Sequence, residues 1–421
     1  MKLKKNLFLS FAIIFFVSLV FLSYFSSCKA QHAWKEKKRR EYLSELNNYI
    51  ENIKSENEKK ISEFVASLTL EQKISQLFIE NLEGNRAFRS YETVGAINNS
   101  DDDSPLIAGG YIFFSYNIAD DRDSMKKYIK SVRDYCDKNN AIQPYLAVDQ
   151  EGGFVNRLKK LNSQLPSNHE VAEKYTVEQA YILYSKQAEE MAELGFNMNL
   201  APVIEPCTDD NREFLGERSF GDVETVNKYA LACVNGYEYN GIATVIKHFP
   251  GNANTDPHTG LPEIKLAQEK LDELTAPFFE ILKYNPCAIL MSHARTSAVD
   301  SRVPACLSSV WVTDILRNRC CYEGIIFSDD IFMDALAKNG YPPEKACIMA
   351  IEAGIDCIMT SEKRFGKQAS VLYRKAKTDL LFAEKIEKSA LRIIKYKINA
   401  GLIDIAGLVD VAGLIDAGDI L

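Results

Sequence analysis

The sequence has no excess of positive charge, because its 50 lysine and arginine residues are outnumbered by 58 aspartate and glutamate residues. The resulting net charge of -8 excludes bulk electrostatic attraction to nucleic acid or to an anionic membrane surface. A neutral or modestly charged small substrate fits this balance better. With 46% hydrophobic residues in 421, the chain has an ordinary globular composition and can form one large domain.

Signatures of cofactor binding are also missing. There is no P-loop, no G-x-G-x-x-G motif after an apolar run and no C-x-x-C pair, so we expect no nucleotide, redox cofactor or metal. The nine cysteines after Cys28 are scattered, which predicts mostly buried thiols that pack as small apolar side chains. In an exported protein their odd number predicts at least one free thiol, with one or two disulfides as an open alternative.

Residues 1–28 have the layout of an export signal. Lysines within the first five residues precede an apolar run from Leu7 to Phe25, and small residues stand directly before Cys28. This order resembles a bacterial lipobox, in which Cys28 is the site of lipidation. An uncleaved membrane anchor and an ordinary cleaved signal are the alternatives. Each predicts an exported protein that acts on the periplasmic or extracellular side of a membrane.

The remaining chain divides into three parts. Residues 29–64 are charged, with apolar residues at three- and four-residue spacing, which predicts a solvated helical spacer. Thr69 and Gln72 then have the spacing of a capping box before an apolar helical pattern, so we expect the folded domain to cover residues 65–400. Residues 401–421 repeat a short Gly-Leu-Ile-Asp type of pattern, and we assign this low-complexity tail no function.

Short apolar runs within residues 65–400 alternate with stretches long enough for a helix. The runs are Leu77 to Ile79, Gly110 to Phe114, Tyr145 to Val148, Met198 to Val203, Thr244 to Ile246, Ala288 to Met291, Ile325 to Phe327 and Cys357 to Met359. Buried strands in this alternation predict an α/β fold, a single (β/α)8 barrel of the TIM-barrel type. A doubly wound open sheet has the same local pattern and is the alternative.

Polar residues stand directly after several of these runs. They are Asp149-Gln150-Glu151, Lys247-His248, Ser292-His293 and Ser328-Asp329-Asp330. The carboxyl ends of the strands form the catalytic rim of a TIM barrel, so these side chains are expected to share one site. Three of the five histidines, at positions 248, 258 and 293, fall at or just beyond such strand ends.

Two groups have the chemistry of glycosidic bond hydrolysis, which needs one carboxylate near the anomeric carbon and a second group that protonates the leaving oxygen. Asp329 and Asp330 follow an apolar strand, with capping of the next helix as the alternative. Asp256 lies two residues before His258 in a loop rich in Gly, Pro and Asn. A carboxylate there can orient an imidazole that gives and takes a proton, whereas a simple Asx-turn is the alternative.

The order of five motifs resembles that of family-3 glycoside hydrolases of the β-N-acetylhexosaminidase type. The motifs are Asp149-Gln150-Glu151-Gly152-Gly153, Gly216-Glu217-Arg218-Ser219-Phe220, Lys247-His248-Phe249-Pro250-Gly251, Asp256-x-His258 and Phe327-Ser328-Asp329-Asp330. The resemblance covers roughly Leu68 to Lys397. It implies a (β/α)8 domain and exo-acting hydrolysis with retention of configuration.

The resemblance also implies a role for each matching residue. Asp329 would attack the anomeric carbon and form a covalent glycosyl-enzyme, and His258, supported by Asp256, would be the general acid and base. The side chains that would hold the sugar beside the cleaved bond are Asp149, Arg157, Arg218, Lys247 and His248. Glu151, His293 and Asp330 would support them, and the mechanism needs no metal. Ion pairs of Arg157 and Arg218 with Glu151 or Glu217 are the structural alternative.

Two features depart from the family pattern. Asn252 and Ala253 stand where the family commonly has His-Gly, and the interval before the Asp256-x-His258 pair is two residues shorter. Phe154 occupies a place where arginine is frequent. These changes bear on substrate preference more than on reaction type.

The expected substrate is a carbohydrate with a terminal β-linked N-acetylhexosamine, such as N-acetylglucosamine in glycans or peptidoglycan fragments. One alternative is a β-glucosidase-like family-3 exo-glycosidase, although such enzymes commonly add a second domain with a glutamate acid and few residues follow Lys397. A surface lipoprotein that binds glycans without turnover is the other. The sequence predicts no oligomeric state.

Overall fold

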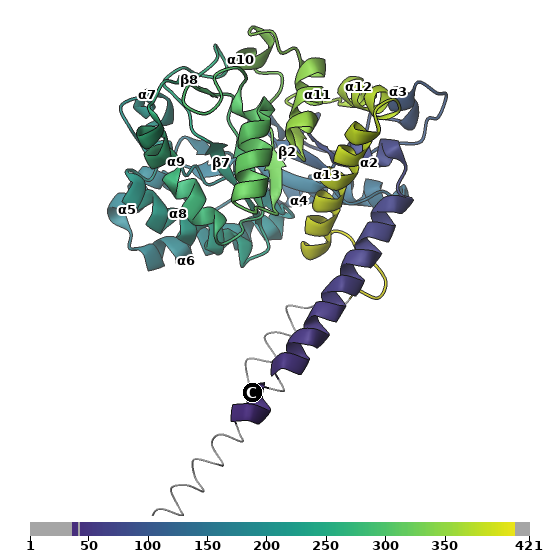
Figure 1. Cartoon of the computed structure of the whole chain (residues 1–421), viewed down its shortest axis with the longest axis horizontal. Coiled ribbons are helices and arrows are strands. Elements are labelled where there is room, and N and C mark those ends of the chain that lie inside the picture. The colour runs from purple at the N-terminus through teal and green to yellow at the C-terminus, as the bar shows by residue number, and fades with distance from the viewer. Residues whose placement is uncertain (1–35, 41–42, 409–421) are drawn as a thin grey trace, which may run out of the picture. The chain divides into compact units, whose positions relative to one another are not determined.

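The computed structural model describes residues 36–40 and 43–408, which belong to two units (Figure 1). In the first unit, residues 36–40 and 43–60 are helical. Within the described ranges, no helix combines the length and the apolar character needed to cross a bilayer. The run from Leu7 to Phe25, Cys28 and the tail from residue 409 lie outside these ranges, so the export signal and its lipidation stay predictions.

The second unit, Ile61–Ile405, contains eight parallel strands in one sheet. Their order is β11, β9, β7, β6, β3, β2, β1, β12. A parallel bridge between Phe327 and Cys357 joins the two ends of this order, so the sheet is a nearly closed barrel. Their bounds are β1 Phe78–Asn81, β2 Gly110–Phe113, β3 Tyr145–Val148, β6 Met198–Asn199, β7 Ala243–Phe249, β9 Ala288–Met291, β11 Ile325–Phe327 and β12 Ile358–Met359. Each predicted apolar run overlaps one strand, so the barrel prediction is confirmed and the open sheet is wrong.

Helices lie around the strands (Figure 1). The longer ones are α4 Arg122–Lys138, α6 Val177–Leu194, α8 Val223–Glu238, α9 Gln268–Leu282, α11 Pro343–Ala353, α12 Gly366–Ala376 and α13 Leu380–Asn399. Shorter helices are α2 Leu70–Gln76, α3 Val94–Asn98, α5 Asn168–Lys174, α7 Arg212–Leu215 and α10 Asp334–Ala337, and Val310–Arg319 is a π-helix. At the start of α2, Thr69 and Gln72 form the predicted capping box. Because helices cover the outside of the barrel, the strands are buried on both faces, which explains their continuous apolar runs.

One buried carboxylate holds the closing strands of the barrel together. Asp356 accepts a hydrogen bond of 2.9 Å from the backbone N–H of Ile326 in β11. Its side chain also pairs with Arg392 at 2.8 Å and with Arg317. Two arginines and a backbone amide therefore compensate the cost of burying this charge.

A buried lysine lies at the opposite end of the barrel from the strand ends that carry the predicted site. Lys397 of α13 donates a hydrogen bond of 2.6 Å to Oε1 of Gln76, and its amine lies 5.6 Å from the centre of the Tyr145 ring. Burial lowers the pKa of Lys397 to about 7. Desolvation disfavours the charged amine, and no carboxylate of the described residues pairs with it.

The cysteines within the described residues are all free thiols. Those at positions 136, 233, 287, 306, 347 and 357 are buried, which confirms the prediction of mostly buried thiols. The alternative of one or two disulfides is not realised among them.

Candidate active site

A cavity of about 510 Å³ opens at the carboxyl ends of the barrel strands. Nearly all of the predicted site residues within the described ranges line this cavity. They are Asp149, Glu151, Arg157, Arg218, Lys247, His248, Asp256, His258, Asp329 and Asp330. They come from different strand ends and loops, as the barrel requires. His293 does not line the cavity but contacts the backbone of Asp330.

Lys247 connects two carboxylates on the wall of this cavity. Its Nζ atom lies 2.7 Å from Oδ1 of Asp149 and 2.7 Å from Oε1 of Glu151. Burial lowers the pKa of Lys247, but the two negative charges outweigh this effect and raise the pKa above its usual value. The amine therefore stays charged and can donate to a hydroxyl oxygen of a bound sugar.

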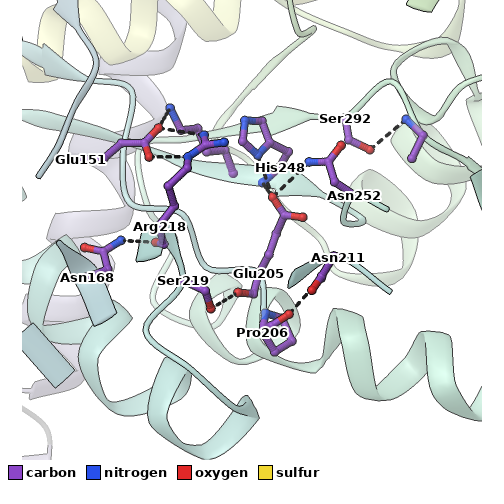
Figure 2. Close-up of polar contacts among 12 residues, drawn as sticks. Glu151, Asn168, Glu205, Pro206, Asn211, Arg218, Ser219, His248, Asn252 and Ser292 are labelled. Atoms are coloured by element: carbon purple, nitrogen blue, oxygen red, sulfur yellow. Dashed lines mark hydrogen bonds and ion pairs between the residues drawn. The ribbon is translucent and has the colours of Figure 1, made fainter. Parts of the chain in front are cut away.

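Arg218 binds the same Glu151 in a two-pronged contact (Figure 2). Its Nε and Nη2 atoms lie 2.8 and 3.0 Å from the two oxygens of the carboxylate. Burial raises the pKa of Glu151, but the charges of Lys247 and Arg218 outweigh it and hold the pKa well below its usual range. Glu151 thus supports two predicted sugar-binding side chains, Lys247 and Arg218. The ion pair of Arg218 with Glu151, weighed as an alternative, is part of the same network.

Arg157 differs from Arg218 because its side chain has no hydrogen bond or ion pair with any described residue. Its side chain lines the cavity, and its Nε atom is buried without a partner. The alternative that Arg157 serves a structural ion pair is therefore wrong. A buried guanidinium N–H without an acceptor is costly, so this side chain is suited to bind an oxygen of a ligand.

Glu205 is a site residue that the sequence analysis missed. It is fully buried, and its Oε1 atom lies 2.7 Å from Nδ1 of His248 (Figure 2). The backbone N–H of His248 and the side-chain amide of Asn252 donate to the same oxygen at 3.2 and 3.1 Å. Glu205 follows the apolar run that ends at Val203, so the same strand-end criterion that selected Asp149 could have found it.

Asp329 lies at the end of β11, partly open to the cavity. Burial raises its pKa, but the neighbouring imidazole groups of His293 and His248 and the N–H of Asp330 outweigh burial, and the pKa is lowered. That N–H donates a hydrogen bond of 2.8 Å to Oδ1 of Asp329. Asp329 is therefore ionised at neutral pH, as a nucleophile must be.

Asp330 is not placed as a second nucleophile. Its carboxylate accepts 3.0 Å hydrogen bonds from the backbone N–H groups of Phe332 and Ser361, and burial raises its pKa. The following helix, α10, has Met333 as its N-cap. The alternative that Asp329 or Asp330 caps the next helix is therefore wrong, and Asp330 braces the loop instead.

His258 and Asp256 form a pair at the cavity mouth. Nδ1 of His258 lies 2.7 Å from Oδ1 of Asp256, and the backbone N–H of His258 donates to the same oxygen at 2.9 Å. Burial raises the pKa of Asp256, but the N–H group and the ring of His258 lower it overall. The Asx-type turn and the oriented imidazole, weighed as alternatives from sequence, occur together.

The shortened loop before this pair is anchored at two points. Asn252 donates to Glu205, and Asn254 donates to the carbonyl of Asp209 at 3.0 Å. The side-chain oxygen of Asn254 also accepts the N–H of Glu213 at 2.9 Å. The two asparagines thus tie the loop to Glu205, which follows β6, and to the segment around α7.

The described residues contain no cluster of three or more His, Cys, Asp or Glu side chains that could hold a metal ion. Charged side chains of the cavity pair with one another, as Lys247 does with Asp149. The guanidinium of Arg157 lines the cavity without such a partner in the described part of the chain. This arrangement suits a neutral, hydroxyl-rich ligand.

Residues 69–396 match the family described as Glycosyl hydrolase family 3 N terminal domain. The chain is 34% identical to a beta-hexosaminidase of Methylococcus capsulatus over 264 residues, which cover 60% of this chain and 75% of the relative. It is 29% identical to beta-hexosaminidase A of Pseudoalteromonas piscicida, covering 69% of this chain and 53% of the relative. The chain thus spans about half the length of that relative.

Solved structures agree with the sequence matches. The family 3 beta-N-acetylglucosaminidase of Paenibacillus sp. str. FPU-7 has a TM-score of 0.70 at 28% identity, over 83% of this chain and 68% of that one. Beta-N-acetylhexosaminidase of Beutenbergia cavernae has a TM-score of 0.66 at 25% identity, over 79% of this chain and 99% of that one. The barrel, the cavity at its strand ends and the match over residues 69–396 lead to one conclusion: this chain belongs to glycosyl hydrolase family 3.

Proposed function

We propose that this protein is an exo-acting β-N-acetylhexosaminidase that removes terminal β-linked N-acetylglucosamine with retention of configuration. The observation that carries the proposal is that one cavity is lined by an ionised carboxylate, Asp329, and by a carboxylate-bound imidazole, His258. Retaining hydrolysis needs these two kinds of group around the anomeric carbon. The names of the relatives from Methylococcus capsulatus and Paenibacillus point to the same activity.

In the first step, Oδ2 of Asp329 attacks the anomeric carbon, since Oδ1 is held by the N–H of Asp330. The glycosidic C–O bond breaks, and the leaving oxygen takes a proton from His258. Asp256 accepts from Nδ1 and stabilises the charged ring. In the second step His258 takes a proton from water, which attacks the anomeric carbon and releases the sugar and Asp329.

The charged side chains on the cavity wall, Asp149, Glu151 and Lys247, hold the sugar during both steps. Lys247 is charged and fixed between Asp149 and Glu151, so it donates to a hydroxyl while Asp149 accepts from one. Arg157 has unused N–H groups, and Glu205 fixes the ring of His248. Side chains held this way keep their orientation, which lowers the entropic cost of positioning the substrate.

The natural substrate class follows from the expected export of the chain. A protein outside the cytoplasm meets peptidoglycan fragments and other glycans that carry β-linked N-acetylglucosamine. Anchoring through a lipid on Cys28 is part of this proposal. Absence of a lipid-modified Cys28 in the purified membrane fraction would remove the lipoprotein part alone.

Release of nitrophenol from the β-N-acetylglucosaminide and from the β-glucoside tests the activity directly. We expect the purified full chain to cleave the acetamido sugar preferentially. Cleavage of the glucoside alone would favour a β-glucosidase-like exo-glycosidase. If the protein binds N-acetylglucosamine oligomers but cleaves neither substrate, it is a glycan-binding protein instead.

A further inference from the structure

His293 is a fully buried histidine next to the proposed nucleophile, and it does not reach the cavity. It follows β9, and both ring nitrogens have a partner. Nε2 lies 3.0 Å from the carbonyl oxygen of Asp330, and Nδ1 lies 3.2 Å from Sγ of Cys306. The ring is therefore held from both sides.

The partners assign the hydrogens of the neutral ring. A carbonyl oxygen only accepts, so the contact with Asp330 favours the tautomer in which Nε2 carries the hydrogen and donates it. Nδ1 is then an acceptor, and the thiol of Cys306 is the donor that faces it. Burial and the negative charge of Asp329 raise the pKa of this thiol well above its usual range, so the hydrogen stays on sulfur.

Backbone hydrogen bonds place Cys306 beside His293. The N–H of Cys306 donates to the carbonyl of Ser292 at 3.1 Å, and the N–H of Ala305 donates to the carbonyl of Ala294 at 2.9 Å. The two accepting carbonyls flank His293 in the chain, so these bonds hold the short helix Ala305–Leu307 next to it. Cys306 is also fully buried, so its side chain has little room to rotate away from the ring.

The contacts continue from His293 to the carboxylate of Asp329. The thiol of Cys306 donates to His293, His293 donates to the carbonyl of Asp330, and the N–H of Asp330 donates to Oδ1 of Asp329. The N–H of Met333 shares the Asp330 carbonyl at 3.1 Å, so His293 is one of two donors there. Loss of either donor would loosen the residue whose N–H orients the nucleophile.

We propose that Cys306 is a positioning residue, whose thiol keeps His293 in the Nε2–H tautomer and thereby fixes the carboxylate of Asp329 for attack. The inference rests on the proposed function, in which Asp329 is the nucleophile. It differs from a packing role because it depends on the S–H donor and not on the volume of the side chain.

The first test measures the tautomer without any substrate. Long-range 15N–1H spectra of the full chain with labelled histidine distinguish the two neutral tautomers of each imidazole, and His293→Gln identifies the His293 signals. We expect the Nε2–H form in the wild type and in Cys306→Ser, which keeps a donor. In Cys306→Ala only the carbonyl of Asp330 still favours the Nε2–H form, so we expect a mixture of the two tautomers. An Nδ1–H tautomer in the wild type, or no change in Cys306→Ala, would overturn the proposal.

The second test measures turnover of nitrophenyl β-N-acetylglucosaminide. We expect Cys306→Ala to lower kcat by about tenfold or more with little change in KM, whereas Cys306→Ser stays within about threefold of wild type. The matched control is Cys347→Ala, which removes another buried thiol and should leave kcat unchanged. Equal kcat losses in Cys306→Ala and Cys306→Ser would contradict the donor role.

The two tests also separate this inference from the proposed function. If the tautomer depends on Cys306 but a trapped sugar is found on a residue other than Asp329, the proposed function fails. The positioning claim fails with it, while the thiol–imidazole contact stands. If Asp329 is labelled but the tautomer ignores the thiol, only the inference about Cys306 is overturned.

Discussion

Nδ1 of His258 lies 2.7 Å from Oδ1 of Asp256, although 73% of the His258 side chain is exposed. The carboxylate can only accept, so Nδ1 carries the hydrogen of this contact. Nε2 is then the ring nitrogen that can exchange a proton with a leaving group. The contact with Asp256 thus fixes the orientation of an exposed imidazole and leaves its Nε2 atom free for proton transfer.

Replacing His258 should affect substrates according to their leaving groups. We expect His258→Ala to lower kcat/KM for an N-acetylglucosamine disaccharide by roughly 10²–10⁴-fold, the usual contribution of a general acid. The leaving group of a dinitrophenyl glycoside needs little protonation. The decrease in kcat/KM for that substrate should therefore be at least tenfold smaller. Parallel assays with both substrates give the comparison, and equal losses would argue against His258 as the acid.

Glu205 should matter for activity although it does not line the cavity. In Glu205→Gln the shape is kept but the charge is lost, so the ring of His248 loses its ionic partner at 2.7 Å. We expect KM for the N-acetylglucosaminide to rise by about tenfold, because one charge-assisted hydrogen bond supports a sugar-binding side chain. Steady-state kinetics test this. Glu213→Gln, on the cavity rim, is the control, and a KM unchanged in Glu205→Gln would count against the role of Glu205.

Phe154 offers an apolar surface at the cavity rim. Its side chain is 96% exposed at the tip of the hairpin of β4 (Gln150–Gly152) and β5 (Val155–Asn156). Gly152, two residues before Phe154, has a φ of 100°, and a Cβ atom there would lie 2.1 Å from a backbone oxygen, so the hairpin is closely packed at this point. An exposed ring in this place is suited to stack on the apolar face of the leaving-group sugar.

We therefore expect Phe154→Ala to raise KM for N-acetylglucosamine oligosaccharides by about threefold to tenfold, the loss expected for one aromatic contact of about 1 kcal/mol. KM for methyl β-N-acetylglucosaminide should not change, since its leaving group is too small to reach the ring. Phe154→Tyr keeps a ring and is the matched control. Equal effects on both substrates would show that Phe154 acts on the bound terminal sugar or on the fold.

Lys397 should make stability depend on pH. Its pKa is about 7 in the folded protein, below the value of 10.5 for an exposed lysine. Between these values the unfolded chain binds one proton more than the folded one, so the free energy of unfolding rises with pH, by up to roughly 1.4 kcal/mol per unit. Below pH 7 both states are protonated, and the cost of the buried charge is fully present.

Urea unfolding of the wild type and of Lys397→Met between pH 7 and pH 9 measures this effect. We expect the wild type to gain about 2 kcal/mol relative to the variant over that interval. Lys283→Met, which removes an exposed lysine, should show no such trend. A difference between wild type and Lys397→Met that is constant with pH would mean that the folded protein does not shift this pKa.

The barrel could be predicted from sequence because each of its strands is buried on both faces and therefore reads as an apolar run. The strand-end rule then selected Asp149, Lys247 and Asp329, since residues after a run must lie at the rim. These inferences need only local sequence and the periodicity of the fold. The position of a residue along its strand was enough.

Other features depend on contacts between distant segments, which periodicity does not encode. The partner of His248 is 43 residues away, and the thiol that faces His293 lies in a separate short helix. Lys397 belongs to an amphipathic helix and would be taken for an exposed residue, yet it is fully buried. Strand-end position marked Glu205 as clearly as Asp149, but no chemical partner was visible for it in the sequence.

Trapping of the glycosyl-enzyme tests the central claim most directly. A 5-fluoro N-acetylglucosaminyl fluoride forms the covalent intermediate but slows its hydrolysis, and mass spectrometry of the digested full chain locates the attached sugar. We predict one fluorosugar on the peptide that contains Asp329, attached to that side chain, and no label in Asp329→Asn. Label on another residue, or no label on an enzyme that hydrolyses the N-acetylglucosaminide, would contradict the account.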